Sequence, residues 1–187
     1  MTDKKSPILN IDDVQYRDTG HGEKYAAKVG DVGGRVGAVK LGYNICVVPP
    51  GKRAWPRHNH IVNEEMFFII EGMGEVVIGA ERMPIRKGDV IANPPGGADT
   101  AHQIVNTSNA DLKYLALSTK LSPEAVEYPD SKKLGVAVPI PDATGAVKFK
   151  RILMRAEAPE IDYWEGEDYP WRLSRAVLSV TARPPLR

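Results

Sequence analysis

Residues 36–120 consist of short apolar runs separated by turn-forming residues, and this pattern restricts the fold more than any other feature. Apolar residues nowhere recur at helical spacing over about ten positions in this stretch. Clusters of Gly, Pro, Asn and Asp separate the runs, as turns separate strands. Several short strands with no helix between them are typical of a closed or sandwiched β structure. The predicted strands cover residues 41–48, 65–71, 75–78, 89–92, 103–105 and 112–118.

The two ends of the chain differ from this central region. Residues 1–35 are polar and rich in glycine, which predicts an irregular arm with room for one short strand. Residues 121–187 are looser and richer in proline, with a predicted helical turn at 122–126. We therefore expect an N-terminal arm, a barrel over 36–120, and a C-terminal extension that packs on the barrel or on a dimer partner. Strand-like segments of this extension lie at 134–138, 147–153 and 177–180.

Charge and cysteine content disfavour several classes of partner and compartment. The 187 residues include 25 basic and 24 acidic side chains, so the formal charge is only +1. This balance predicts no nucleic-acid partner and no attraction to an anionic membrane surface. Cys46 is the single cysteine, which rules out an internal disulfide and fits a reducing compartment. Because the first residues lack an apolar segment, we expect no secretory signal and a cytoplasmic protein.

Three of the four histidines are placed to meet a glutamate. His58 and His60 are separated by one residue, so on a strand both imidazoles point to the same face. Glu65 begins the next predicted strand, and His102 lies near a later one. Imidazoles and a carboxylate are ligands that divalent transition metals accept. One histidine on a strand is usually a surface or hydrogen-bonded core residue, but burying all four groups without a metal would be costly.

Two segments also resemble the two sequence motifs of the cupin family. The first contains Gly51, His58, His60, Glu65 and Gly72, and the second contains Gly88, Pro94-Pro95-Gly96, His102 and Asn106. The resemblance covers about residues 42–118 and implies an all-β, double-stranded β-helix (jelly-roll) barrel with N- and C-terminal extensions. It also implies one divalent metal ion (Fe, Mn, Ni or Zn) bound by His58, His60, Glu65 and His102. The loop before His102 is longer than in the usual second motif.

Cupins with this ligand set include dioxygenases, isomerases, decarboxylases and lyases, and many cupins are homodimers. The resemblance therefore implies a small-molecule metalloenzyme and a homodimer; the alternative is a non-catalytic cupin that binds or senses a small polar ligand. Segments 127–130 (Glu-Tyr-Pro-Asp) and 163–167 (Tyr-Trp-Glu-Gly-Glu) are similar to segments of an uncharacterised, single-barrel subgroup of cupins. No nucleophile elbow, phosphate loop or dinucleotide fingerprint occurs in the sequence, which disfavours those enzyme classes.

Four further residues are candidates for contact with a small-molecule ligand. They are Trp55, Phe67, Asn106 and Tyr114. The aromatic residues are equally consistent with filling the barrel, and Asn106 is equally consistent with a structural role in a turn. Strand parity places Phe67 on the same face as Glu65 and points Glu64 away from it. No second pair of titratable groups can be placed near the metal from the sequence, so the reaction is left open.

Overall fold

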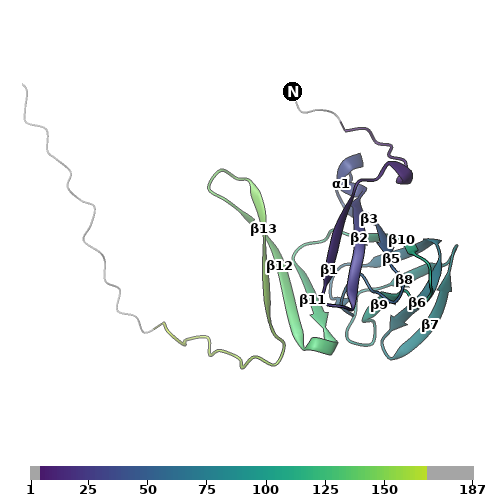
Figure 1. Ribbon diagram of the computed structural model, residues 1–187. Coiled ribbons are helices and arrows are strands. Elements are labelled where there is room, and N and C mark those ends of the chain that lie inside the picture. Colours follow the sequence, from purple (N-terminus) through teal and green to yellow (C-terminus); the bar gives the residue numbers. More distant parts are fainter. Residues whose placement is uncertain (1–4, 168–187) are drawn as a thin grey trace, which may run out of the picture. The chain divides into compact units, whose positions relative to one another are not determined.

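The structure is a computed structural model that describes residues 5–167, and it is built almost entirely from antiparallel strands (Figure 1). The short helical segments are a 3-10 turn at Ile11–Asp13, α1 (Gly33–Val36) and a 3-10 turn at Pro129–Ser131. The first strands are β1 (Tyr16–His21), β2 (Tyr25–Asp31), β3 (Leu41–Val48), β4 (Asn59–His60), β5 (Glu65–Glu71), β6 (Met73–Ile78) and β7 (Glu81–Arg86). The later strands are β8 (Val90–Asn93), β9 (His102–Val105), β10 (Leu112–Thr119), β11 (Glu124–Tyr128), β12 (Lys133–Pro141) and β13 (Val147–Arg155).

The strands form three sheets. A six-stranded sheet has the order β1-β2-β3-β10-β5-β8, and a three-stranded sheet has the order β7-β6-β9. The third sheet has four strands in the order β13-β12-β11-β4, and β12 and β13 form a long hairpin (Figure 1). Buried apolar side chains from the first two sheets belong to one cluster, so these sheets enclose the interior of the barrel. The expected all-β jelly-roll architecture is confirmed.

Strand alternation explains how the interior is filled. In β5, Phe67 and Ile69 are buried while Phe68 between them is exposed, as the period of two requires. Full burial of such a side chain contributes about 1.5–3 kcal/mol, so the interior cluster supplies much of the driving force for folding. The cluster also contains Val29, Cys46, Val48, Val76, Ile85, Ile91, Ile104, Leu112 and Tyr114.

The prediction of an irregular arm over residues 1–35 is wrong in its local structure. β1 and β2 pair as an antiparallel hairpin, and β2 continues the main sheet by pairing with β3. Two glycines that suggested irregular chain instead permit close packing. A Cβ on Gly20 would lie 2.6 Å from the carbonyl oxygen of Tyr25 on the paired strand, and one on Gly30 would meet the side chain of Val14.

The predicted helical turn at 122–126 is also wrong, because residues 124–128 form β11. This strand pairs with β12 and with β4, and these pairings outweigh the local capping signal. The strands predicted at 134–138 and 147–153 are confirmed as parts of β12 and β13. The strand predicted at 177–180 lies outside the described residues. Within residues 5–167, no helix has the length and apolar character that crossing a membrane requires.

The chain divides into two units, residues 1–157 and 158–187. Of the second unit, residues 158–167 are described. The rings of Tyr163 and Trp164 make an edge contact there, with 4.8 Å between their centroids. Both sequence motifs lie in the first unit.

Candidate metal centre

The four predicted metal ligands lie together inside the barrel. One ligand atom from each of His58, His60, Glu65 and His102 lies within 4.8 Å of the corresponding atoms of the other three. Glu65 begins β5, His102 begins β9, and His60 ends β4, so three strands from three different sheets contribute. Residues separated by more than forty positions therefore converge on one polar end of an otherwise apolar interior.

Backbone hydrogen bonds hold the histidine pair against two sheets. His58 and His102 exchange both backbone bonds, at 3.2 and 2.8 Å. His60 pairs with Val126 of β11, on the other side. Because side chains alternate along an extended segment, His58 and His60 face the interior together and Asn59 points away from them. The short segment 58–60 is therefore hydrogen-bonded on one side to β9 and on the other to β11, which restrains both imidazole rings.

Glu65 lies at the centre of the three imidazoles. Its Oε2 is 3.0 Å from Nε2 of His102 and 3.9 Å from Nε2 of His58. Its Oε1 is 3.6 Å from Nε2 of His60. All three histidines thus present the same nitrogen, Nε2, toward one carboxylate. This is a convergence of four ligand atoms rather than a set of separate surface ion pairs.

Backbone carbonyls fix the orientation of two of the rings. Nδ1 of His58 lies 2.9 Å from the carbonyl oxygen of Pro56, and Nδ1 of His102 lies 3.1 Å from that of Thr100. A carbonyl oxygen can only accept a hydrogen bond, so Nδ1 carries the hydrogen in both rings. In the neutral ring the lone pair is then on Nε2, the atom that faces Glu65. Metal-binding histidines in proteins are commonly oriented in this way.

The electrostatic environment keeps a carboxylate beside neutral imidazole. Burial, and next the neighbouring His102, lower the pKa of His58 to about 4. Burial alone would raise the pKa of Glu65, but the neighbouring His102 and His60 outweigh it and hold that pKa well below its usual range. Burial would likewise lower the pKa of His60, but Glu65 and Glu124 outweigh it and raise that pKa. At neutral pH, Glu65 is therefore ionised and His58 carries a lone pair.

The donor set fits a divalent transition metal. Three imidazole nitrogens and one carboxylate oxygen suit iron, manganese, nickel or zinc. Both Nδ1 and Nε2 of His60 are buried and lack a hydrogen-bond partner within the described residues. A buried nitrogen without a partner is costly, and a bound cation would give Nε2 of His60 a partner. The expected ligand set is thus sterically and chemically able to hold one ion.

β11 and the segment after it support the ligands from the side, a role that sequence reasoning missed. Glu124 places Oε2 3.5 Å from Nδ1 of His60 and accepts a backbone hydrogen bond from Asn63 at 3.1 Å. The ring of Tyr128 stacks on His58, with 6.0 Å between centroids. The only signal in the sequence was the resemblance of residues 127–130 to a subgroup of cupins, which indicated lineage and no contact.

The candidates for ligand contact occupy different surroundings. Phe67 packs edge-on against His102 at 5.6 Å between centroids, and Tyr114 lies behind it, 5.5 Å from Phe67. Both residues belong to the interior cluster, and of the two Phe67 borders the metal centre. Trp55 is partly exposed. Asn106 follows the end of β9 opposite His102, and its amide is hydrogen-bonded both to Val48 at the end of β3 and within the turn. These contacts favour the structural role that the sequence left open for Asn106.

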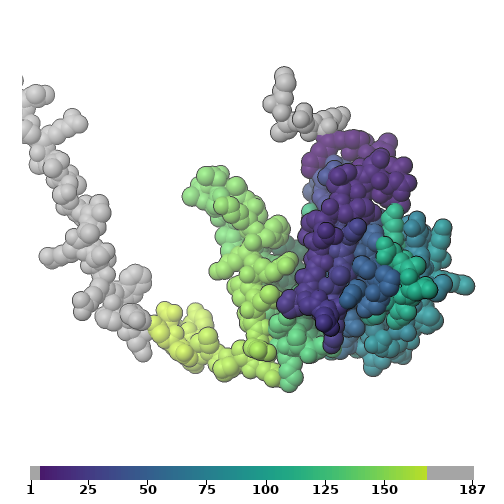
Figure 2. Space-filling view, in the orientation of Figure 1, coloured from purple at the N-terminus to yellow at the C-terminus, as the bar shows by residue number. Residues whose placement is uncertain are grey.

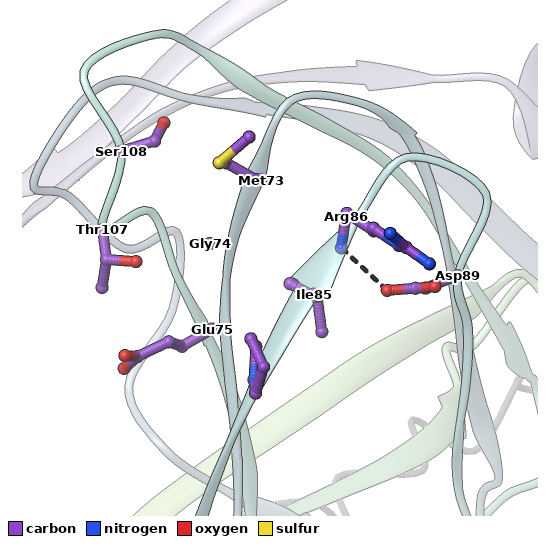
Figure 3. A pocket seen from close by; sticks show the side chains of 9 residues that line it. Met73, Gly74, Glu75, Ile85, Arg86, Asp89, Thr107 and Ser108 are labelled. Atoms are coloured by element: carbon purple, nitrogen blue, oxygen red, sulfur yellow. Dashed lines mark hydrogen bonds between the residues drawn. The ribbon is translucent and has the colours of Figure 1, made fainter.

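A separate pocket of about 540 Å³ lies between β6, β7 and the turn at 107–108 (Figure 3). In it the carboxylate of Asp89 accepts a hydrogen bond from the backbone N–H of Arg86 at 2.7 Å. Its lining contains no histidine or cysteine. It is also at the other end of β6 from Ile78, the residue that pairs with His102. The chemistry-bearing residues therefore lie elsewhere, at the histidine end of the barrel.

An antiparallel barrel with a three-histidine, one-glutamate cluster at one end defines a class of protein, and comparisons with known proteins show what the chain is similar to. Residues 44–118 match the cupin domain family. This match covers most of the barrel and both histidine-bearing segments. An uncharacterized protein of Methanocaldococcus jannaschii is 36% identical over 80 residues, which are 43% of this chain and 61% of that relative.

Solved structures share the same fold. A proposed sugar phosphate isomerase of Acidithiobacillus ferrooxidans superposes with a TM-score of 0.70 at 22% identity, covering 83% of this chain and 96% of that one. A sugar phosphate isomerase of Silicibacter pomeroyi gives a TM-score of 0.66 at 23% identity, with 84% and 98% covered. A predicted oxalate decarboxylase of Thermotoga maritima gives 0.53 at 22% identity, with 61% and 99% covered.

Proposed function

We propose that this protein is a metal-dependent cupin that binds one divalent ion at His58, His60, Glu65 and His102 and acts on a small, oxygen-rich molecule. The observation that carries the proposal is the convergence of these four ligand atoms within 4.8 Å. The backbone carbonyls that orient two of the rings support it, because they turn Nε2 toward the cluster. A merely structural histidine cluster does not need this common orientation.

A divalent ion held here would serve as a Lewis acid toward oxygen atoms of a bound molecule. The residues of the chain have distinct tasks around it. Glu65 supplies a negative charge that offsets part of the charge of the ion. Glu124 restrains His60 through its contact with Nδ1. Phe67 closes the side of the centre next to His102 and keeps water away from it. In this low-dielectric surrounding, electrostatic attraction to an oxygen-rich ligand is stronger than in water.

The four ligands specify a metal site, but they are compatible with several classes of reaction. We infer an enzyme of the isomerase, decarboxylase, lyase or dioxygenase type, with a non-catalytic cupin that binds or senses a small polar ligand as the alternative. Two of the similar solved proteins are named for sugar phosphate isomerisation and one for oxalate decarboxylation. Both kinds of substrate are small and rich in oxygen. These proteins share the fold, and the proposal itself rests on the residues of the site.

Elemental analysis of the purified protein tests the metal site. We expect about one iron, manganese, nickel or zinc ion per chain in the wild type, and loss of this metal in the His58→Ala/His60→Ala double variant. His21→Ala is the matched control, because His21 is the remaining histidine and lies exposed on β1. The control should keep the metal. A wild type that holds no metal after reconstitution with each of the four ions would refute the proposal.

A second measurement separates the enzyme from the binding protein. With Mn²⁺ in the site, the relaxation rate of water protons reports whether the ion keeps a position that exchanges with solvent. Exchangeable water that a small carboxylate displaces from the ion supports an enzyme. Turnover is then tested by oxygen uptake if the metal is iron, and with isomerase and lyase substrates if it is zinc or nickel. An ion closed to both water and carboxylates would favour the binding protein.

We also propose that the chain forms a homodimer. Val147, Phe149 and Leu153 alternate along β13, so they point to one face, and all three are exposed. The tip of the β12–β13 hairpin stands free of the barrel in the space-filling view (Figure 2). Exposed apolar side chains on an edge strand favour association with another chain.

The cytoplasmic location expected from the single cysteine stays a prediction.

A further inference from the structure

Asn93 is a buried asparagine whose amide has no partner. Its exposed fraction is only 2%. Within residues 5–167, both its Nδ2 and its Oδ1 are buried and make no hydrogen bond. His60 is the other residue in that part of the chain with two such atoms, and it belongs to the metal centre. The other fully buried asparagines differ: Asn106 uses both ends of its amide, and Asn59 donates two hydrogen bonds through Nδ2.

The amide of Asn93 faces the same interior as the metal ligands. Asn93 ends β8, and its Cα is the register partner of Glu65 on β5. Directly paired residues of antiparallel strands share one face of the sheet, with Cβ atoms about 4.5–5.5 Å apart. The pair two positions further, Phe67 and Ile91, is buried in the interior cluster, which identifies that face as the inner one.

The chain after Asn93 also runs beside another ligand. The backbone N–H of Gly96 donates to the carbonyl oxygen of His60 at 2.9 Å. Asn93 is therefore bracketed by Glu65 on the neighbouring strand and by the segment that carries His60. Sequence reasoning missed Asn93 because the predicted strand ends at Ala92 and the second motif resumes at Pro94.

Leaving a carboxamide without partners in an apolar barrel is unfavourable, because a buried group that makes no hydrogen bond has lost its bonds to water without replacement. Proteins tolerate this where a ligand or ordered water completes the bonds. A carboxamide offers one acceptor oxygen and two donor hydrogens at the same place. The molecule that satisfies both ends carries a hydroxyl hydrogen and a carbonyl or carboxylate oxygen close together.

We propose that Asn93 is a substrate-binding residue of the metal centre, selecting a small ligand with a hydroxyl group next to a carboxylate or ketone. This inference rests on the proposed function, because the ligand would also contact the bound ion. Oδ1 accepts a hydrogen bond from the hydroxyl group, and Nδ2 donates one to the neighbouring carbonyl or carboxylate oxygen. Asn93 thus distinguishes an α-hydroxy acid or α-hydroxy ketone from a molecule that lacks the hydroxyl group.

The first test measures stability without metal. Asn93→Leu replaces the amide by an apolar group of similar size, so the urea midpoint of the metal-free protein should stay equal or rise. Asn106→Leu is the matched control, because Asn106 is equally buried but fully hydrogen-bonded, and its midpoint should fall. If Asn93→Leu destabilises as much as Asn106→Leu, the amide serves the fold or a structural water, and the proposal is overturned.

The second test measures ligand affinity in the metal-loaded protein. Wild type and Asn93→Leu, both loaded with Co²⁺, are titrated with glycolate and with acetate, and binding is followed through the visible absorption of the ion. We expect the affinity for glycolate to fall about tenfold in the variant, as the loss of a hydrogen bond to a buried partner predicts. The affinity for acetate, which has no hydroxyl group, should fall less.

The outcomes separate this inference from the proposed function. Absence of metal from the wild type refutes the metal centre itself and is seen before any glycolate is added. Equal Co²⁺ content in both proteins with glycolate affinities within about twofold overturns the role of Asn93 alone. Failure of glycolate to bind the loaded wild type overturns the assigned ligand class, and an equal loss for acetate and glycolate overturns the recognition of the hydroxyl group.

Discussion

Replacement of Asn106 by alanine should destabilise the barrel without removing its metal. The side chain connects two parts of the fold: Nδ2 donates to the carbonyl oxygens of Val48 at 2.8 Å and Ala110 at 2.7 Å. Its Oδ1 accepts from the backbone N–H and the hydroxyl group of Ser108, at 2.9 and 2.8 Å. The turn after β9 is thereby attached to the end of β3, far along β9 from His102.

The magnitude follows from what the truncation leaves behind. Val48 is fully buried, so its carbonyl oxygen loses a donor that water cannot replace, at a cost of about 1–3 kcal/mol. Ala110 is exposed, so water replaces part of the second bond and the loss there is about 1 kcal/mol. The sum is about 2–4 kcal/mol. With an m-value of about 2 kcal/mol per molar urea, the unfolding midpoint should fall by about 1–2 M.

Urea unfolding of the metal-free protein measures this loss, and elemental analysis checks the metal. Asn109→Ala is the matched control, because Asn109 lies in the same turn but is exposed, and its effect should stay within about 0.5 kcal/mol. Equal midpoints for the two variants would refute the structural role of Asn106. A stable Asn106→Ala protein with weakened glycolate binding would instead support the ligand contact that the sequence left open.

Two further predictions concern the buried thiol and the exposed hairpin. Burial raises the pKa of Cys46 from 9.0 to about 11, so the folded state holds this proton more tightly and stability should be lost as the pH rises above 9. Urea midpoints at pH 8 and 10 should therefore differ more for the wild type than for Cys46→Ala, and parallel profiles would contradict this. Sedimentation should give the mass of a dimer, and Phe149→Lys on the exposed face of β13 should shift it toward monomer; a wild-type monomer would overturn the homodimer.

Much of the barrel could be predicted because its signals are local. The alternation of Phe67, Phe68 and Ile69 is a property of any half-buried strand, and it placed the correct residues in the interior. The spacing of His58 and His60 likewise puts both rings on one face of an extended segment without reference to the rest of the chain. Strand periodicity and residue chemistry therefore determined the fold class and the set of four residues that meet.

The tertiary structure alone decided which distant segments support the site. The sequence predicts a helical turn at 122–126 where β11 forms, because the pairing of β11 with β4 joins residues more than sixty positions apart and leaves no local pattern. The same long-range pairing brings Glu124 to His60 and Asp130 into an ion pair with Arg57 at 2.6 Å. The unpartnered amide of Asn93 is likewise visible only once the barrel is closed, because burial and the absence of a partner are properties of the surroundings and not of the residue.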